Sequence, residues 1–301
     1  MEEENPPRPV EGGPSPEWPH YSLYEQVKKA LGALPFRFRT KLQIAGMAAT
    51  DLFTLNTALG AAIEQSVVDN LNELRSLWDP DGKYALYSFV RQPQAFPDVR
   101  LQTSSPDLDP KILLGIELKG WFILSKEGEP SFRYKASACV CQPQDLLAVF
   151  PWKFDEVISG VPQLMRPFVT SARYAAEHRN HYWEYGRGAA DGGIRLAEDH
   201  APYPQKGARF NDEAVADSGG NFGRVARGGL MTEFIQQLME EPLNGIPAKH
   251  WHAFLKAFAD GATDDAIRRK IARIRAAGAA DENGPLMQIA NALEEIVGSS
   301  G

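Results

Sequence analysis

The sequence predicts an α/β protein in which a mixed central sheet is flanked by helices and followed by a mainly helical C-terminal part. Three observations lead to this class. Apolar residues recur at steps of three or four between Leu52 and Trp78, which is typical of a long amphipathic helix. Short apolar segments separated by Pro and Gly turns fill residues 84–152, as expected for strands. Beyond residue 230 the helical period returns.

The N-terminal half is expected to hold a tail, helices and strands in that order. Residues 1–18 contain Pro, Gly and Glu with little to bury, which predicts a disordered tail. A short helix is predicted from Tyr21 to Leu31. The strand-like segments that follow the long helix are 84–90, a segment that begins near Pro97, 111–124, 131–141 and 145–152, the last of which could also start as a short helix.

The C-terminal half is expected to be helical around one long loop. Residues 163–185 favour a helix that carries aromatic and basic side chains. Residues 189–229 are rich in Gly and Arg, and so long a segment without periodicity is a functional loop or a disordered one. Further helices are predicted at 230–241, 247–259, 263–276 and 285–297. The predicted organisation is a tail (1–18), a core domain (19–188), the long loop region (189–229) and a helical C-terminal region (230–297).

Composition restricts the class of protein. The chain has 301 residues, of which 43% are hydrophobic and 24% charged, so it can bury a substantial core. A net charge of −7 argues against a protein that coats nucleic acid over its whole surface, but it permits a local basic cleft. Two cysteines, Cys139 and Cys141, are too few for a disulfide framework and are expected to be reduced. Without a signal peptide or a run of about 18 apolar residues, a cytoplasmic protein with no membrane contact is expected.

Charged residues interrupt two neighbouring strand-like segments. Asp98 follows Pro97 where the chain enters a strand, and Glu117 and Lys119 alternate within an apolar strand, so they project from one face. If the two strands pair, two carboxylates meet in an apolar setting and repel one another unless a cation lies between them. Mg²⁺ suits this position because it takes a few carboxylate ligands and keeps several waters. The lysine would offset the clustered negative charge and position a metal-bound water.

The motif formed by Pro-Asp at 97–98 and Glu-Leu-Lys at 117–119 resembles that of the PD-(D/E)XK nuclease superfamily, to which many type II restriction endonucleases belong. The order of a helix, a strand, a strand with Asp and a strand with Glu-x-Lys is also similar to that family's order. The resemblance covers about residues 50–150 and implies a restriction-endonuclease-like core.

The resemblance also implies a role for each motif residue. Asp98 and Glu117, helped by the backbone carbonyl of Leu118, would bind a catalytic Mg²⁺, and Lys119 would orient the attacking water. Because the family often adds a glutamate from the helix before the first core strand, Glu64 is a further candidate at this site. A cross-strand ion pair without a catalytic role is the alternative interpretation of the same charges.

By this resemblance the chain is expected to be a Mg²⁺-dependent endonuclease that hydrolyses phosphodiester bonds of double-stranded DNA. A type II restriction endonuclease or a related host-defence nuclease fits best, and a protein that cuts both strands of a symmetric site would be a homodimer. Two alternatives stay open. One is a repair or recombination nuclease with the same core, and the other is a non-catalytic DNA-binding or scaffold protein that retains the sheet.

Arginines in three segments are candidates for DNA contact. Arg173 and Arg179 recur at roughly helical spacing, although a solvated helix face explains them equally well. Arg224 and Arg227 stand among glycines, which let backbone amides approach a phosphate. The run of five cations at 267–275 suggests a helix-turn-helix-like pair, but a solvated face is the favoured interpretation.

A zinc site is a further alternative. Cys139 and Cys141 with His178 and His181 supply the ligand types of a tetrahedral zinc centre. Their spacing is unusual and the two pairs are far apart in the sequence. Core packing of the cysteines and a surface position for the histidines are therefore favoured.

Overall fold

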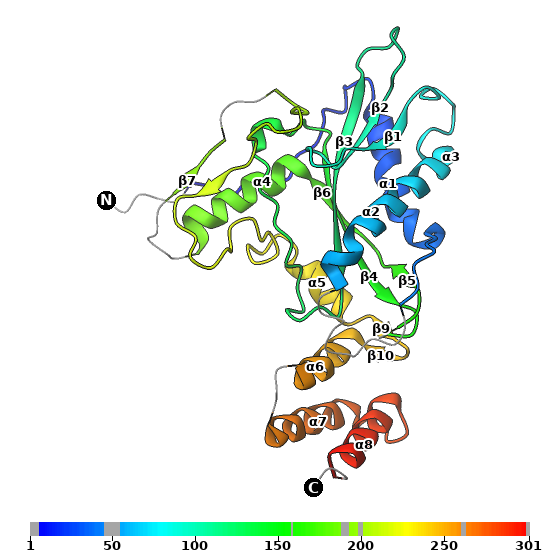
Figure 1. Ribbon diagram of the computed structural model, residues 1–301, viewed down its shortest axis with the longest axis vertical. Coiled ribbons are helices and arrows are strands. Elements are labelled where there is room, and N and C mark those ends of the chain that lie inside the picture. Colours follow the sequence, from blue (N-terminus) through cyan, green and yellow to red (C-terminus); the bar gives the residue numbers. More distant parts are fainter. Residues whose placement is uncertain are drawn as a thin grey trace.

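A curled mixed sheet forms the centre of the protein (Figure 1). The computed structural model describes residues 6–44, 55–157, 159–187, 193–197, 201–259 and 263–298. The sheet's strands are β1 (Ser88–Arg91), β2 (Val99–Gln102), β3 (Ile112–Phe122), β4 (Leu146–Phe154), β5 (Pro162–Leu164) and β6 (Phe168–Ser171). They are ordered β1-β2-β3-β4-β5, and β6 also pairs with β4. The β3–β4 pair is parallel and the other pairs are antiparallel, so the predicted mixed sheet is confirmed.

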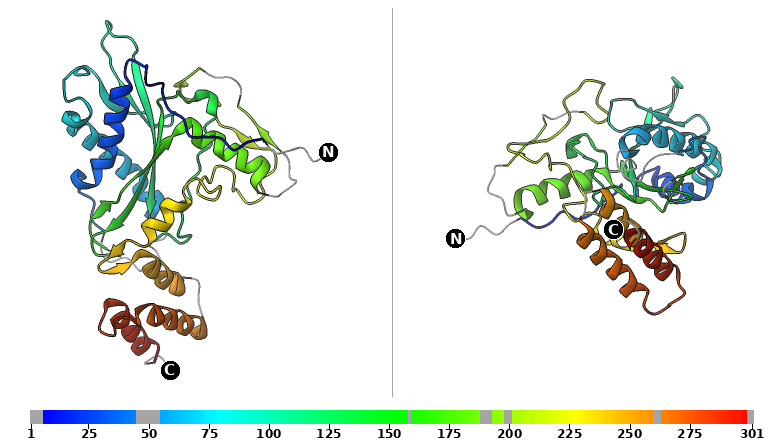
Figure 2. Two further views of the ribbon diagram at one scale, coloured as in Figure 1. Left: turned by 180° about the vertical axis from the view of Figure 1, so that it is seen from behind. Right: turned by 60° about the horizontal axis from the view of Figure 1, so that its bottom comes forward.

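Helices cover both faces of this sheet (Figure 2). The helices α1 (Tyr21–Arg37), α2 (Leu55–Glu73) and α3 (Arg75–Trp78) lie on one side, and α4 (Ala172–His181) lies on the other. The predicted long helix is thus divided at Leu74, and its positions 52–54 lie outside the described residues. A π-helical turn, Tyr182–Gly186, continues α4.

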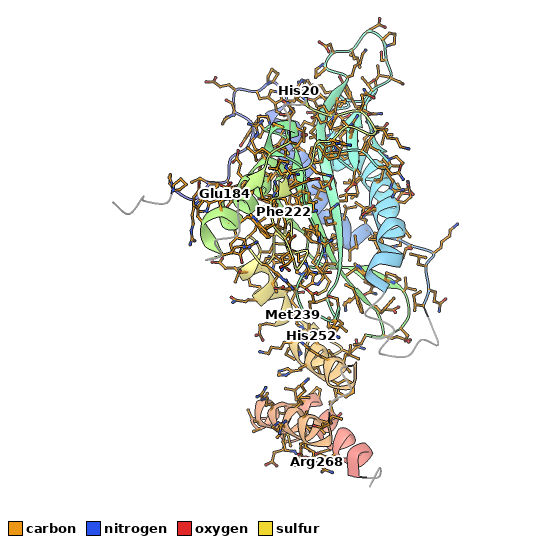
Figure 3. All side chains as sticks on the ribbon, turned by 60° about the vertical axis from the view of Figure 1, so that its left-hand side comes forward. His20, Glu184, Phe222, Met239, His252 and Arg268 are labelled. Carbon is orange, nitrogen blue, oxygen red and sulfur yellow. The ribbon has the colours of Figure 1, made fainter. Side chains whose placement is uncertain are left out.

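The C-terminal part is helical, as predicted. Its helices are α5 (Thr232–Met239), α6 (Ala248–Ala259), α7 (Asp264–Gly278) and α8 (Pro285–Gly298), and a short hairpin of β9 (Pro242–Leu243) and β10 (Ile246–Pro247) separates α5 from α6. Helix α5 lies beside the sheet, whereas α6, α7 and α8 extend beyond its end (Figure 1), and Figure 3 places His252 at the junction and Arg268 in the outlying part. Among the described residues, no helix is both long and apolar enough to cross a membrane.

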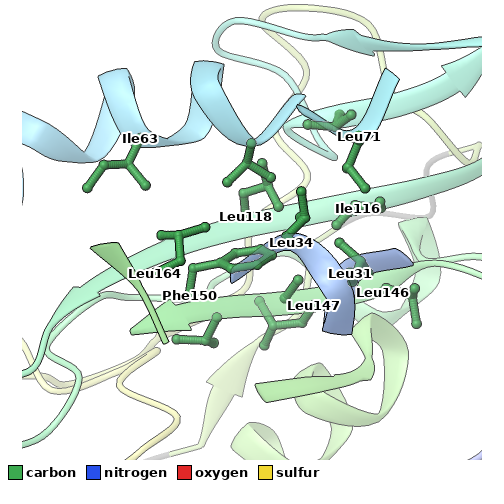
Figure 4. Close-up of a cluster of buried hydrophobic side chains, with 14 of the residues drawn as sticks. Leu31, Leu34, Ile63, Leu71, Ile116, Leu118, Leu146, Leu147, Phe150 and Leu164 are labelled. Carbon is green, nitrogen blue, oxygen red and sulfur yellow. The ribbon is translucent and has the colours of Figure 1, made fainter. Parts of the chain in front are cut away.

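Between Ile116 and Lys119 of β3, buried apolar side chains alternate with partly exposed charged ones, so the core lies on one face of this stretch and the charges on the other. Ile116 and Leu118 are almost fully buried and lie against Ile63 and Leu71 of α2 (Figure 4). Burial of each such side chain stabilises the fold by about 1.5–3 kcal/mol. The residues between them therefore face the opposite layer, the side on which α4 packs.

The N-terminal segment corrects the predicted disordered tail. Residues 6–18 lie along the protein, whereas 1–5 are outside the described residues. The carboxylate of Glu11 accepts hydrogen bonds from Thr170 Oγ1 (2.7 Å) and from the backbone N–H of Ser171 (3.1 Å), at the start of α4. A polar segment can thus be ordered by hydrogen bonds at a helix N-terminus without burying much apolar surface.

Two other predicted elements are wrong in part. Residues 131–141 form no sheet strand, because the backbone of this segment bonds to the long loop instead, as in Tyr134 N–H to Gly223 O (2.8 Å). The helix predicted at 163–185 begins only at Ala172, because the residues before it form β5 and β6 on β4. The described parts of 189–229 hold turns and the two-residue strands β7 (Ile194–Arg195) and β8 (Glu213–Ala214), while 189–192 and 198–200 lie outside the described residues.

Candidate functional site

The register of β2 on β3 brings the motif residues together. Val99 pairs with Ile116, so Asp98, one residue before β2, lies beside Glu117. Because the two strands are antiparallel, β3 continues past Val99, the first residue of β2, as far as Phe122. Along this stretch β3 pairs with β4. The charged residues therefore lie where β2 and β3 diverge, with side chains that are 26% (Asp98), 12% (Glu117) and 18% (Lys119) exposed.

Lys119 lies between the two carboxylates. Its Nζ is 2.8 Å from Glu117 Oε1 and 3.2 Å from Asp98 Oδ2. The backbone N–H of Asp98 also donates to Glu117 Oε2 (3.3 Å). The prediction that these three side chains share one place is confirmed, and their catalytic role stays a prediction.

Leu118 contributes its backbone to the same cluster. Its side chain is buried against α2, and its N–H donates to Asp98 Oδ2 (3.0 Å). In a strand the N–H and C=O of one residue point to the same side, because a hydrogen-bonded residue pair exchanges both bonds. The carbonyl of Leu118 therefore points toward the side on which Asp98 lies.

Glu64 lies at the margin of this cluster. It follows the buried Ile63 on α2, and its Oε2 is 3.5 Å from a guanidinium nitrogen of Arg91, the last residue of β1. The charge of Asp98 raises the pKa of Glu64, and the charge of Lys119 lowers it. Arg91 had no sequence signal, because its place depends on the pairing of β1 with β2.

Burial dominates the ionisation of the acidic side chains. It raises the pKa of Glu117 to about 7, with a further contribution from Asp98, although Lys119 opposes the shift. Burial also raises the pKa of Glu64, again with help from Asp98. For Lys119, burial disfavours the charge, but Glu117 and Asp98 outweigh it and raise the pKa of the ammonium. The cluster thus holds a protonated lysine and a carboxylate that retains its proton unusually well.

This shift predicts a pH-dependent stability for the metal-free protein. Because the pKa of Glu117 is about 7 in the folded state and 4.5 ordinarily, the folded state holds a proton that the unfolded state releases between these values. Stability should therefore fall as pH rises through this window, while Lys119 stays protonated throughout. Denaturant unfolding in EDTA at about pH 5 and about pH 8 should show wild type losing about 1 kcal/mol or more relative to Glu117→Gln. If wild type and Glu117→Gln differ in unfolding free energy by the same amount at both pH values, the raised pKa of Glu117 is contradicted.

The donor set suits a hard divalent cation. Among the described residues, no group of three or more His, Cys, Asp and Glu side chains is placed to hold a metal ion. Mg²⁺ does not need such a cage, since it binds through one or two carboxylates and completes its shell with water and substrate phosphates. Asp98, Glu117 and the carbonyl of Leu118 would be the protein's part of such a shell. Glu64, now paired with Arg91, could act through a bound water.

Gly115 and Asp145 support the cluster, and sequence reasoning missed both. A Cβ on Gly115 would lie 2.2 Å from Pro97 Cγ and 2.9 Å from Asp145 Oδ1. Only glycine therefore lets the segment with Asp98 approach β3 so closely. The buried Asp145 accepts hydrogen bonds from Gly115 N–H (2.6 Å) and Tyr203 Oη (2.9 Å), which ties the long loop to β3. The only sequence signal for this support was Gly115 itself, a glycine inside an apolar strand two residues before Glu117.

No protein-family model, curated protein or solved structure matches the chain. The likeness of the motif residues to a nuclease family therefore stays an interpretation of the sequence. What supports a function is the geometry of the cluster of Glu64, Arg91, Asp98, Glu117 and Lys119.

Arg179 corrects one predicted DNA contact. Its side chain is 3% exposed and forms an ion pair with Asp212, which is 0% exposed. The same guanidinium donates to the carbonyls of Tyr134 (2.8 Å) and Ala136 (3.0 Å). A group that is buried and bonded in this way cannot reach a phosphate, so its role is structural.

The other three arginines stay candidates for DNA contact. Arg173 is partly exposed, and its Nε and a terminal nitrogen donate to the carbonyl of Cys141 (3.1 and 2.7 Å). Arg224 and Arg227 both form ion pairs with Glu127 (2.8 and 3.2 Å). Their charge is thus largely compensated, and a phosphate would have to displace an existing partner.

The cysteines and histidines do not form a zinc centre. Among the described residues no such ligand group exists. Cys141 is buried, and burial raises its pKa to about 12, so it stays a thiol. Its sulfur lies 3.3 Å from the hydroxyl of Tyr134, while His181 Nε2 lies 3.0 Å from Pro6 O. Core packing and a helix surface explain these residues.

Proposed function

We propose that this chain is a Mg²⁺-dependent endonuclease that hydrolyses phosphodiester bonds of double-stranded DNA on a restriction-endonuclease-like core. One observation carries the proposal. Asp98 and Glu117 come from neighbouring strands and share a single ammonium group, that of Lys119, at the point where the strands diverge. A type II restriction endonuclease or a related host-defence nuclease, acting as a homodimer, is the specific form of the proposal.

The charges of the cluster fit a phosphate substrate once a divalent cation is present. Three carboxylates face two cations, Lys119 and Arg91, and the pKa of Glu117 is raised to about 7, so without metal the cluster has no net positive charge to attract DNA. A bound Mg²⁺ would make the cluster positive and supply the Lewis acid that stabilises developing charge on a phosphoryl oxygen. Binding of metal and binding of DNA should therefore support one another.

Lys119 acts in this proposal as a hydrogen-bond donor. Its pKa is raised, so at neutral pH the amine is protonated and cannot accept a proton from water. An ammonium group can still hold a water by one of its three N–H bonds while the carboxylates take the others. Its task would be to align the attacking water with the scissile phosphate.

Two alternatives differ in what they predict. A repair or recombination nuclease would use the same residues but would cut at particular DNA structures instead of giving discrete fragments. A non-catalytic DNA-binding or scaffold protein is favoured by the ion pairs of Lys119 themselves, because they satisfy the buried carboxylates without any metal.

A cleavage assay tests the proposal. Long DNA of varied sequence, incubated with wild type and Mg²⁺, is expected to give discrete fragments, with no products in EDTA. Asp98→Asn should lower the rate by about 10³-fold or more, because it removes a metal ligand. Asp107→Asn, an exposed acid between β2 and β3, serves as the matched control and should cut normally. Cutting in EDTA, or equal cutting by Asp98→Asn, would contradict the assignment.

A further inference from the structure

We propose that one exposed face of α7, formed by Arg268, Arg269 and Arg273 and here termed the arginine face, is a second DNA-binding surface that contacts backbone phosphates away from the cleavage site. The inference rests on the proposed function for its choice of double-stranded DNA as partner. It gives a role to the C-terminal helices, which contribute no residue to the cluster on β2 and β3.

The packing of α7 fixes which of its sides faces solvent. Ile271 and Ile274 are 2% and 4% exposed and form a small separate core with Ala290 of α8. The three arginines project away from this core and are exposed. Arg269 and Arg273 are one helical turn apart, so they lie side by side on the surface.

The cations of α7 differ in whether the described residues provide them with a partner. Helix α7 carries five cations and, at its start, two acids. Arg275 is bound by Glu294 (2.7 Å), and Lys270 donates to the carbonyl of Ala253 (3.4 Å). For the three arginines of the face, the described part of the chain provides no ion pair. Arg269 and Arg273 are like charges one turn apart, an arrangement that destabilises a helix, so an outside anion would relieve their repulsion.

The concentration of charge is local, because the whole chain has a net charge of −7. A polyanion would therefore be attracted to this face and repelled by much of the remaining surface. Duplex DNA offers one phosphate per about 3.4 Å along each strand, so neighbouring arginines can neutralise neighbouring phosphates. The planar guanidinium group is suited to this contact, since it can donate two parallel hydrogen bonds to a phosphate.

The surface is less suited to a membrane. Membrane-surface helices combine basic residues with large apolar side chains that enter the lipid. The exposed positions next to the arginines hold Ala272 and Ala276, which are small. The large apolar residues of α7 are already buried against α8.

The outlying helices are attached near the end of the strand that carries the cluster. On α6, Trp251 Nε1 donates to Leu243 O (2.9 Å), and His252 Nε2 lies 3.1 Å from the carbonyl of Lys126. Lys126 follows β3 by four residues. Helix α7 packs on α6 in turn, so the arginine face is held in a defined place relative to the core (Figure 3).

The test is DNA binding by the full chain in EDTA, measured by fluorescence anisotropy of a labelled duplex of about 40 base pairs as a function of salt. The triple variant Arg268→Ala, Arg269→Ala, Arg273→Ala should bind at least tenfold more weakly at low salt. The slope of log affinity against log salt should become shallower by about 2 to 3, since each phosphate contact contributes about 0.9. A variant with lysine at the same three positions should keep most of the slope.

A matched control removes three exposed cations elsewhere, by Lys29→Ala, Arg37→Ala and Lys83→Ala, and should leave the slope nearly unchanged. The inference is overturned if the two triple variants lose affinity equally, if the arginine variant keeps the wild-type slope, or if it loses binding only to vesicles of anionic lipid. Circular dichroism checks that each variant is folded. The lysine variant keeps the positive charge at the three positions, so it separates loss of charge from loss of the arginine side chains. DNA binding that depends on the arginine face without any cleavage would refute the proposed nuclease and leave this inference standing.

Discussion

Replacement of Lys119 by methionine is expected to abolish DNA cleavage and, at the same time, to tighten the binding of Mg²⁺. The ammonium group contacts both Glu117 and Asp98, so in the metal-free protein it neutralises the carboxylates that would hold the metal. Without it the two acids are left facing one another with one positive charge fewer nearby. At an effective dielectric constant of about 20, removing a cation about 4 Å away changes the energy of a charge by several kcal/mol.

The expected magnitudes are a fall in cleavage rate of about 10²- to 10⁴-fold and a gain in Mg²⁺ affinity of at least tenfold. Isothermal titration of Mg²⁺ measures the affinity directly. Thermal unfolding gives a second measure, because a ligand that binds only the folded state stabilises it by RT ln(1 + [L]/Kd), where [L] is the free ligand concentration. In EDTA the Lys119→Met variant should be less stable than wild type, and Mg²⁺ should recover more stability in the variant. Lys153→Met, on the adjacent strand β4, is the control and should change neither property.

The two changes together separate a catalytic cluster from a purely structural one. If the ion pairs of Lys119 serve only the fold, the variant should lose stability in EDTA and Mg²⁺ should not restore it. A variant that binds Mg²⁺ more tightly and still cuts DNA would instead remove Lys119 from the proposed reaction while leaving the metal site in place. The experiment thus tests the ligand set and the water-positioning role independently.

Local periodicity accounts for what the sequence predicted of the site. The alternation around Glu117 and Lys119 is a property of one strand, so it correctly placed both on one face. Asp98 approaches Glu117 if the preceding strand-like segment pairs with this strand, which it does. In contrast, Gly115 and Arg91 take their roles from strand register, which a single strand's pattern does not contain.

The wrong predictions of secondary structure and of the Arg179 contact have one cause, namely interactions with segments far away in the sequence. Residues 131–141 alternate like a strand, but their backbone bonds to the loop near Gly223 and Asn211. Strands β5 and β6 have three and four residues and are stabilised by pairing with β4, so helical periodicity around them was misleading. Arg179 shares a helix with Arg173, and only the position of Asp212 in the long loop decides that one is buried.

Arg179→Met is expected to destabilise the fold by about 3–5 kcal/mol, the usual effect of removing one partner of a buried ion pair. Asp212 would remain, with Asn180 Nδ2 (3.1 Å) and the backbone N–H of Ala197 (2.9 Å) as its hydrogen-bond donors. The carbonyls of Tyr134 and Ala136 would also lose their donor. Urea unfolding at neutral pH measures the change, and Arg173→Met on the same helix is the control, with an expected loss of about 1 kcal/mol.

A double variant shows whether the loss comes from the uncompensated charge. Asp212→Asn removes the charge that Arg179→Met leaves behind, so the two changes together should destabilise less than the sum of the single changes. Because Arg179 also holds the backbone at 134–136, the double variant should still be less stable than wild type. If Arg179 were a DNA contact, its loss would instead weaken DNA binding and leave the urea midpoint unchanged. The burial of both partners argues that the arginine ties α4 to the long loop at Asp212, so that this part of the loop belongs to the folded core.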